Sequence, residues 1–162
     1  MGRKRKSTVP FIVLGLAIVG GGLWRHLDQM PGSPLTRLCT RVVDGDTIQL
    51  EGGERVRLIG VDTPESVAPN RPQEFFGLEA AAFTRQLVEG KQVRLEFGDE
   101  RYDIYGRTLA YVYLLEDGTF LNSEIIRRGY GYAYTRFPFR YRDEFRRLQR
   151  EARENRIGLW AR

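Results

Sequence analysis

The chain has 162 residues, 41% of them hydrophobic and 12% aromatic, which excludes a disordered chain and leaves room for one globular domain plus a targeting segment. A single cysteine and a single histidine exclude an internal disulfide framework and a Cys/His zinc site. The formal net charge of +5 is concentrated in residues 1–34, where five basic side chains face one acid, whereas residues 35–162 hold 21 basic and 20 acidic side chains. Any partner of the domain must therefore be recognised through local patches of charge.

Residues 1–25 form a basic and then apolar segment that is typical of export. Four consecutive basic residues, Arg3 to Lys6, precede 16 mostly apolar residues from Val9 to Trp24, and Arg25 closes the stretch. This pattern predicts a secretory signal peptide or an uncleaved membrane anchor, although the stretch is shorter than the roughly 20 residues that span a bilayer comfortably. The remaining alternative, a buried core helix, leaves the basic cluster without a purpose. Either export signal places the domain outside the cytoplasm, anchored in the membrane or secreted.

Residues 26–35 form a linker rich in turn residues, and residues 36–162 form the predicted domain. Its first part, from 38 to 61, alternates between apolar and polar residues and predicts three short strands. Asp44-Gly45 separates the first two strands. Gly52-Gly53 separates the second and third and is a hairpin signal.

The second part of the domain mixes helices with strands. Apolar residues at helical spacing predict a helix over 76–87, with Gly90 ending it. Strands are predicted over 92–97 and 108–115, joined by a loop from Gly98 to Arg107. Asn122 is predicted to cap a short helix that ends at Gly129, and the last helix is predicted over 140–156.

Five short strands with a helix inserted after the third predict an α+β, mainly β, fold. We expect a five-stranded closed barrel of the oligonucleotide/oligosaccharide-binding (OB) type with about three helices, preceded by one N-terminal hydrophobic helix.

Three short motifs in the domain combine carboxylates with arginines. They are Asp-Gly-Asp-Thr at 44–47, a run from Arg57 to Glu65 that contains Asp62, and Asp-Ile-Tyr-Gly-Arg at 103–107. Acidic residues without histidine offer only oxygen ligands, which suit Ca²⁺ or Mg²⁺. The planar guanidinium of arginine matches the oxygens of a phosphate group. Each motif alone also fits an ordinary turn or surface segment, so the pattern leaves a structural interpretation open.

Taken in order and spacing, these motifs resemble the staphylococcal nuclease (thermonuclease) family. The resemblance includes Val43 to Thr47, Arg57 to Glu65 and Tyr105 to Tyr111, and it continues to Trp160. It covers nearly the whole domain. It implies a five-stranded OB-type barrel with three helices that hydrolyses DNA and RNA with one Ca²⁺ ion as cofactor.

The resemblance also implies roles for individual side chains. Asp46 and Asp62 match Ca²⁺ ligands, and the backbone carbonyl of Thr63 matches a third ligand. Arg57 and Arg107 match two catalytic arginines that bind phosphate.

Other positions match the base and the nucleotide pocket of the family. Glu65 matches the glutamate usually assigned as general base, and Tyr105 matches a tyrosine of the nucleotide pocket. Tyr132 and Tyr134 lie where the family places further pocket tyrosines, so they are candidate substrate-binding residues. Ile104 departs from the pattern, because family members often carry a lysine there.

We expect a monomeric, calcium-dependent endonuclease that acts on DNA and RNA by metal-assisted, in-line attack of water. The alternative is a catalytically silent OB-fold module that only binds nucleic acid at the cell envelope. A glycosidase that uses a pair of carboxylates is a third possibility, and it leaves Arg57 and Arg107 without a role.

Overall fold

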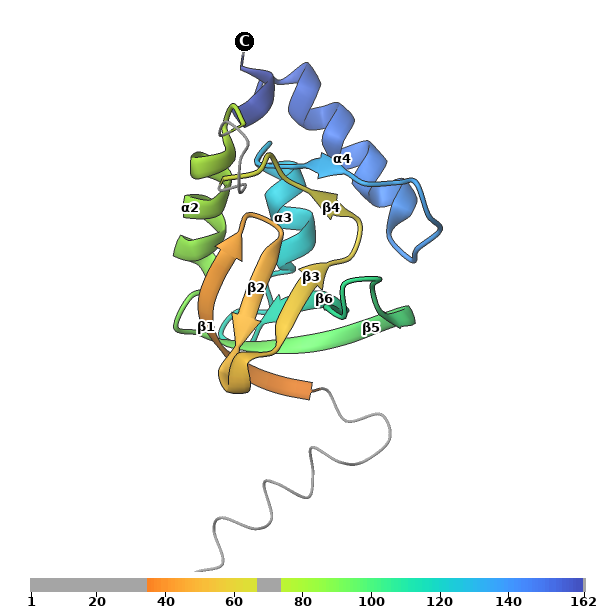
Figure 1. The fold of residues 1–162 in the computed structure, drawn as a ribbon. Coiled ribbons are helices and arrows are strands. Elements are labelled where there is room, and N and C mark those ends of the chain that lie inside the picture. The colour runs from red at the N-terminus through yellow and green to blue at the C-terminus, as the bar shows by residue number, and fades with distance from the viewer. Residues whose placement is uncertain (1–34, 67–73, 162) are drawn as a thin grey trace, which may run out of the picture. The chain divides into compact units, whose positions relative to one another are not determined.

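The computed structural model describes residues 35–66 and 74–161, and Figure 1 shows their arrangement. The predicted N-terminal hydrophobic helix lies outside these residues. The strands are β1 (Leu35–Asp44), β2 (Thr47–Leu50), β3 (Arg55–Leu58), β4 (Val61–Asp62), β5 (Gln92–Tyr102), β6 (Thr108–Leu114) and β7 (Tyr132–Ala133). The helices are α2 (Gly77–Val88), α3 (Leu121–Arg127) and α4 (Arg142–Glu154), with short 3-10 helices η1 (Glu51–Gly53) and η2 (Gly158–Trp160). Across the described part of the chain, none of these helices is both long and apolar enough to cross a membrane.

Five strands form a closed barrel in the order β1-β2-β3-β6-β5, which confirms the predicted fold class. Neighbouring strands are antiparallel except β3 and β6, which run parallel, and β5 returns to pair with β1. The predicted hairpin joins β2 to β3 through η1, where Gly52 and Gly53 adopt φ values of 82° and 87°. These angles are open to glycine at little cost, so the glycine pair sets the turn.

The core of the domain fills the barrel and the space beneath the helices. Alternate residues of the strands face inward, so Ile48, Val56, Val93 and Val112 are fully buried. Helix α4 adds Phe145, Leu148 and Ala152, which helical spacing places on one face. Figure 1 shows α2 and α3 beside one end of the barrel, where the turn between β1 and β2 lies.

Cys39 belongs to this core and is the single cysteine of the chain. Its side chain is fully buried, and its backbone N–H and C=O bond to Lys91 and Gly90 at 2.9 and 2.8 Å. Burial is the main reason that the pKa of the Cys39 thiol rises to about 11. The thiol therefore stays protonated at neutral pH, and it packs as a small apolar side chain.

The structure corrects the predicted loop from Gly98 to Arg107. Strand β5 continues to Tyr102, and Tyr102 pairs with Thr108 of β6 after an irregularity in the register beyond Phe97. A glycine inside a strand often marks such a bulge, and Gly98 sits at this one. The loop is therefore limited to residues 103–107.

The structure also corrects the predicted capping role of Asn122. Phe120, not Asn122, precedes the first turn of α3, and Asn122 is fully buried inside the helix. Its Oδ1 accepts a hydrogen bond from the N–H of Val112 at 2.9 Å, and its Nδ2 donates to the carbonyls of Ile59 and Ala110. Asn122 therefore ties α3 to the barrel.

Candidate active site

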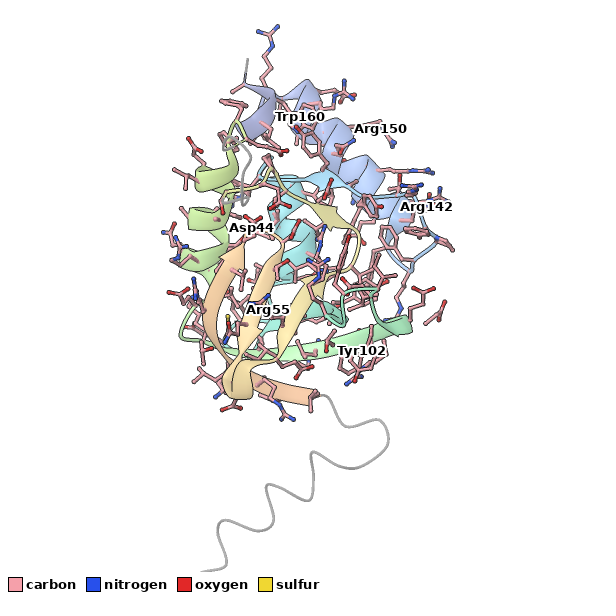
Figure 2. The ribbon with its side chains drawn as sticks, viewed as in Figure 1. Asp44, Arg55, Tyr102, Arg142, Arg150 and Trp160 are labelled. Carbon is pink, nitrogen blue, oxygen red and sulfur yellow. The ribbon has the colours of Figure 1, made fainter. Side chains whose placement is uncertain are left out.

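The turn between β1 and β2 carries the first motif. Thr84 of α2 donates a hydrogen bond from its hydroxyl to the carbonyl of Gly45 at 2.7 Å, which fixes the turn against the helix. A Cβ atom on Gly45 would lie 2.7 Å from Oγ1 of Thr63, so only glycine fits there. Asp44 and Asp46 flank this glycine, and Figure 2 shows Asp44 at the end of the barrel strands. Both carboxylates are largely buried, with exposed fractions of 9% and 6%.

Asp46 is the centre of a hydrogen-bonded network. Its Oδ2 accepts the N–H of Thr63 at 3.0 Å and pairs with Nη1 of Arg57 at 3.0 Å. Its Oδ1 accepts the hydroxyl of Thr47 at 3.0 Å. Burial raises the pKa of Asp46, and the opposing effects of Arg57 and of the hydrogen bonds from Thr63 and Thr47 do not cancel that rise. The site thus holds a carboxylate that gains from additional positive charge.

Arg57 lies on β3 directly opposite Thr47 of β2, and its guanidinium holds two predicted metal ligands at once. Nη1 contacts Asp46, and Nη2 pairs with Oδ1 of Asp62 at 3.2 Å. Nη1 also donates to the carbonyl of Val61 at 2.6 Å, which fastens β4 beside β3. The structure therefore brings Asp46, Arg57 and Asp62 together, as the family resemblance implies.

Arg107 joins the same network from the start of β6. Its Nε bonds to Oδ2 of Asp103 at 2.7 Å, and its Nη1 lies 3.5 Å from Oγ1 of Thr47. The Thr47 hydroxyl donates to Asp46, so it links the two arginines through one threonine and one aspartate. Two guanidinium groups therefore face one end of the barrel.

Glu65 and Arg107 line an open groove of about 1130 Å³ on the barrel surface, and Tyr105 lines it as well. The backbone of Glu65 is held by Glu74, whose side chain accepts its N–H at 3.1 Å. A hydrogen bond with Asp44 is the main reason that the pKa of Glu65 rises to about 7, and partial burial and the charges of Asp44, Asp46 and Glu74 add to it. The groove thus joins a carboxyl group and a guanidinium group in one accessible space.

Tyr132 and Tyr134 do not line this groove. Tyr132 pairs with Asp62 in the ladder between β4 and β7, but its ring meets Trp160 edge-on at 5.3 Å. The ring centre of Tyr134 lies 6.1 Å from that of Phe137. Neither tyrosine is among the described residues that line the groove, whereas Tyr105 is, with 77% of its surface exposed.

Comparison with known proteins identifies the family of the chain. Residues 55–162 match the family described as staphylococcal nuclease homologue. The chain belongs to the staphylococcal nuclease family. Thermonuclease of Staphylococcus intermedius is 42% identical to it over 171 residues, which cover 98% of this chain and 99% of that protein. Thermonuclease of Staphylococcus hyicus is 37% identical, over 75% of this chain and 73% of that protein. Endonuclease YncB of Bacillus subtilis is 38% identical, over 75% of this chain and 59% of that protein.

The oxygen atoms around Asp46 fit the calcium use of the staphylococcal nuclease family. Within residues 35–66 and 74–161, no group of three acidic, histidine or cysteine side chains lies close enough together to hold a metal ion. The predicted set needs only two carboxylates and a carbonyl, and these are oxygen donors that suit a hard cation. The hydroxyl of Thr63 is buried and has no hydrogen-bond partner among the described residues. An unsatisfied oxygen beside buried carboxylates favours a cation with its bound water at this position.

Thr47 and Asp103 belong to the site but were not among the site residues predicted from the sequence. Thr47 links Arg107 to Asp46, and Asp103 accepts the Nε of Arg107. Both residues belong to the motifs at 44–47 and 103–107, so their place in the motif was the available signal. Their connecting role depends on the pairing of β2 with β3 and on the tight turn before β6, which spacing alone does not predict.

Proposed function

We propose that the chain is a Ca²⁺-dependent nuclease that hydrolyses phosphodiester bonds of DNA and RNA by in-line attack of water. The observation that carries this proposal is the network in which Arg57, Asp46, Thr47 and Arg107 are joined beside an open groove. Membership of the family and the names of its relatives, thermonuclease and endonuclease, support the same activity.

The two arginines would act on the phosphate group. Attack by water builds negative charge on the non-bridging oxygens, and a guanidinium fork placed beforehand stabilises that charge where it forms. Arg107 lines the groove and can meet the phosphate directly. The fork of Arg57 is shared between Asp46 and Asp62, so a phosphate group must compete with these carboxylates for it.

Asp46 and Asp62, with the carbonyl of Thr63, would hold the Ca²⁺ ion. When bound, the ion would supply positive charge that stabilises the negative charge of the transition state. Glu65 would accept a proton from the attacking water, because its carboxyl group lines the same groove as Arg107. A positioned general base of this kind typically contributes about 10²–10⁴-fold to the rate.

A digestion assay tests the proposed activity. Plasmid DNA and a single-stranded RNA are incubated with the purified protein in Ca²⁺, in Mg²⁺, and in Ca²⁺ with excess chelator. We expect cleavage of both substrates with Ca²⁺, less with Mg²⁺ because its octahedral shell is less adaptable, and none with the chelator. If correctly folded protein binds the nucleic acid and leaves it intact, the chain is instead a silent binding module.

We further propose that the domain acts outside the cytoplasm, on the strength of the export pattern in residues 1–25. Fractionation of cells that express the full chain tests this. Protein in the membrane fraction that resists salt and needs detergent for extraction supports an anchor, and a mature N-terminus near Leu23 supports a cleaved signal. Full-length protein found wholly in the cytoplasm would contradict the proposal.

A further inference from the structure

The groove beside Arg107 extends well beyond the residues that carry the proposed chemistry. Glu65, Tyr105 and Arg107 line one part of it. The rest is lined by the first residues of β1, by η1 with the start of β3, and by the end of β5. The side chains of this second part, which we call the distal arm, are Leu35, Arg37, Glu54, Arg55, Arg101 and Tyr102.

The distal arm is positively charged. Three arginines line it, and the exposed side chain of Arg55 makes no hydrogen bond or ion pair with any described residue. The guanidinium of Arg101 lies 3.2 Å from the ring centre of Phe97, which holds it in place on the surface of β5. The one carboxylate of the arm, Glu54, accepts the hydroxyl of Thr108 at 2.5 Å. The guanidinium groups of the distal arm therefore suit the binding of a polyanion.

The distal arm also carries an exposed aromatic ring. Tyr102 is 60% exposed at the end of β5, three residues before Tyr105, which is 77% exposed. Figure 2 shows Arg55 and Tyr102 on the barrel, away from Arg150 on α4. Aromatic rings interleaved with arginines along a groove are the usual platform for single-stranded nucleic acid, because unpaired bases can stack while the cations meet the backbone.

We infer that the distal arm binds nucleotides that flank the scissile phosphate of a single-stranded substrate. This inference rests on the proposed nuclease function and assigns Tyr102 to base stacking and Arg55 to a backbone phosphate. A duplex keeps its bases paired and stacked, so it cannot use the ring of Tyr102 in this way. Cleavage of a single strand long enough to reach the distal arm should therefore depend on Tyr102 and Arg55, whereas cleavage of a dinucleotide should not.

The test compares substrates of different length on the full chain in Ca²⁺. The substrates are a thymidine dinucleotide, a ten-nucleotide single-stranded oligothymidylate, and a duplex of ten base pairs. The variants are Tyr102→Ala and Tyr102→Phe, with Ile104→Ala as the matched control. Ile104 is 91% exposed on the same hairpin and is not among the described residues that line the groove.

We expect Tyr102→Ala to lower kcat/KM on the ten-nucleotide single strand by roughly 5- to 150-fold, the value of one base stack. Tyr102→Phe keeps the ring and should retain the activity, and Ile104→Ala should be unchanged. All variants should cleave the dinucleotide like the wild type. An equal loss on both single-stranded substrates, or no loss on either, would overturn the distal arm.

The backbone contact is tested by the dependence of KM on salt. Arg55→Gln should weaken the binding of the ten-nucleotide strand and reduce the slope of log affinity against log salt by about 0.7, the share of one phosphate contact on a single strand. Arg150→Gln on α4 is the control and should leave the slope unchanged. An unchanged slope in Arg55→Gln would overturn its assignment. If the wild type cleaves no substrate at all, the proposed function itself fails, whereas cleavage of all substrates without these differences overturns only the distal arm.

Discussion

Arg57 and Arg107 have different surroundings, and this difference separates the effects of the same substitution at each position. The side chain of Arg57 is 16% exposed and bridges Asp46 and Asp62, whereas that of Arg107 is 28% exposed and forms its ion pair among the described residues with Asp103. Lysine keeps the charge but loses the planar fork. Both substitutions should therefore impair catalysis, and only the one at Arg57 should also disturb a buried carboxylate.

We predict that Arg57→Lys and Arg107→Lys each lower kcat by about 10²–10³, the usual cost of losing one placed donor to the transition state. Arg57→Lys should in addition lower the free energy of unfolding by about 1–3 kcal/mol, because the buried Asp46 loses a partner. Steady-state kinetics and urea unfolding measure the two effects, with Arg150→Lys as the control. Nearly normal turnover with reduced stability in both variants would make the two arginines structural.

Asp46 allows metal binding to be tested apart from activity. Asp46→Asn keeps the shape and one acceptor but removes the charge that a hard cation needs. We predict that the Ca²⁺ affinity measured by calorimetry falls at least about tenfold, a loss typical even of groups that only support a ligand. Asp103→Asn, which removes a carboxylate paired with Arg107 instead, should leave the affinity nearly unchanged. Equal affinities in wild type and Asp46→Asn would remove Asp46 from the metal site.

At the scale of elements, the turn between β5 and β6 is held by one side chain. Asp103 accepts the N–H groups of Tyr105 and Arg107 at 2.9 Å each and the Nε of Arg107 at 2.7 Å. Gly106 adopts a φ of 77°, which closes the turn. The turn aims both Tyr105 and Arg107 at the groove.

The pH dependence of stability should report on this turn. Partial burial raises the pKa of Asp103, but the hydrogen bonds from Arg107 and Tyr105 and the charge of Arg107 outweigh it, so the net shift is downward. A lowered folded pKa stabilises the protein above the unfolded value of about 3.9, and this stabilisation is lost as the pH falls through the folded pKa.

Asp103→Asn should therefore be less stable than the wild type at pH 7, and the difference should shrink as the pH falls below about 4. Urea unfolding at pH 7 and at pH 3 measures the two differences. Asp99→Asn, on the exposed part of β5, should follow the wild type at both values. A difference that stays constant with pH would mean that the charge of Asp103 does not hold the turn.

The bounds of helices and strands could be predicted from the sequence where local signals set them, and not where they depend on a distant partner strand. The helix predicted over 76–87 occurs as α2 over 77–88, because its apolar spacing and Gly90 are local signals. The extension of β5 to Tyr102 was not predictable in this way, because pairing with Thr108 across an irregular register depends on the partner strand. The inward position of Asn122 likewise depends on strand β6 and on the carbonyl of Ile59.

The candidate site likewise contains contacts that could be expected from the sequence and contacts that could not. The family resemblance implied a common site for Asp46, Arg57 and Asp62, and the ion pairs of Arg57 with both carboxylates bring the three side chains together. The motifs could not predict that the ring of Tyr132 contacts Trp160, because that contact depends on how the C-terminal residues return to β7.

At the scale of the whole domain, Asn122 connects helix α3 to the barrel. Asn122→Ala would leave the buried N–H of Val112 without its partner, and this group alone costs about 1–3 kcal/mol. We predict at least that loss in the free energy of unfolding, measured in urea. Asn155→Ala removes an exposed hydrogen bond that the side-chain amide of Asn155 donates to the carbonyl of Glu151, and it should cost far less. Equal effects of the two substitutions would show that the buried contacts of Asn122 add little.

The reactivity of Cys39 can report how often the closed barrel opens. The chain has no other thiol, and this one lies within β1, fully buried and protonated at neutral pH. A maleimide or disulfide reagent should therefore modify the native protein only when β1 separates from its neighbours, so the labelling rate counts openings of the barrel. Mass spectrometry of the wild-type protein during labelling could then measure how substrate or calcium slows these openings, without an introduced cysteine.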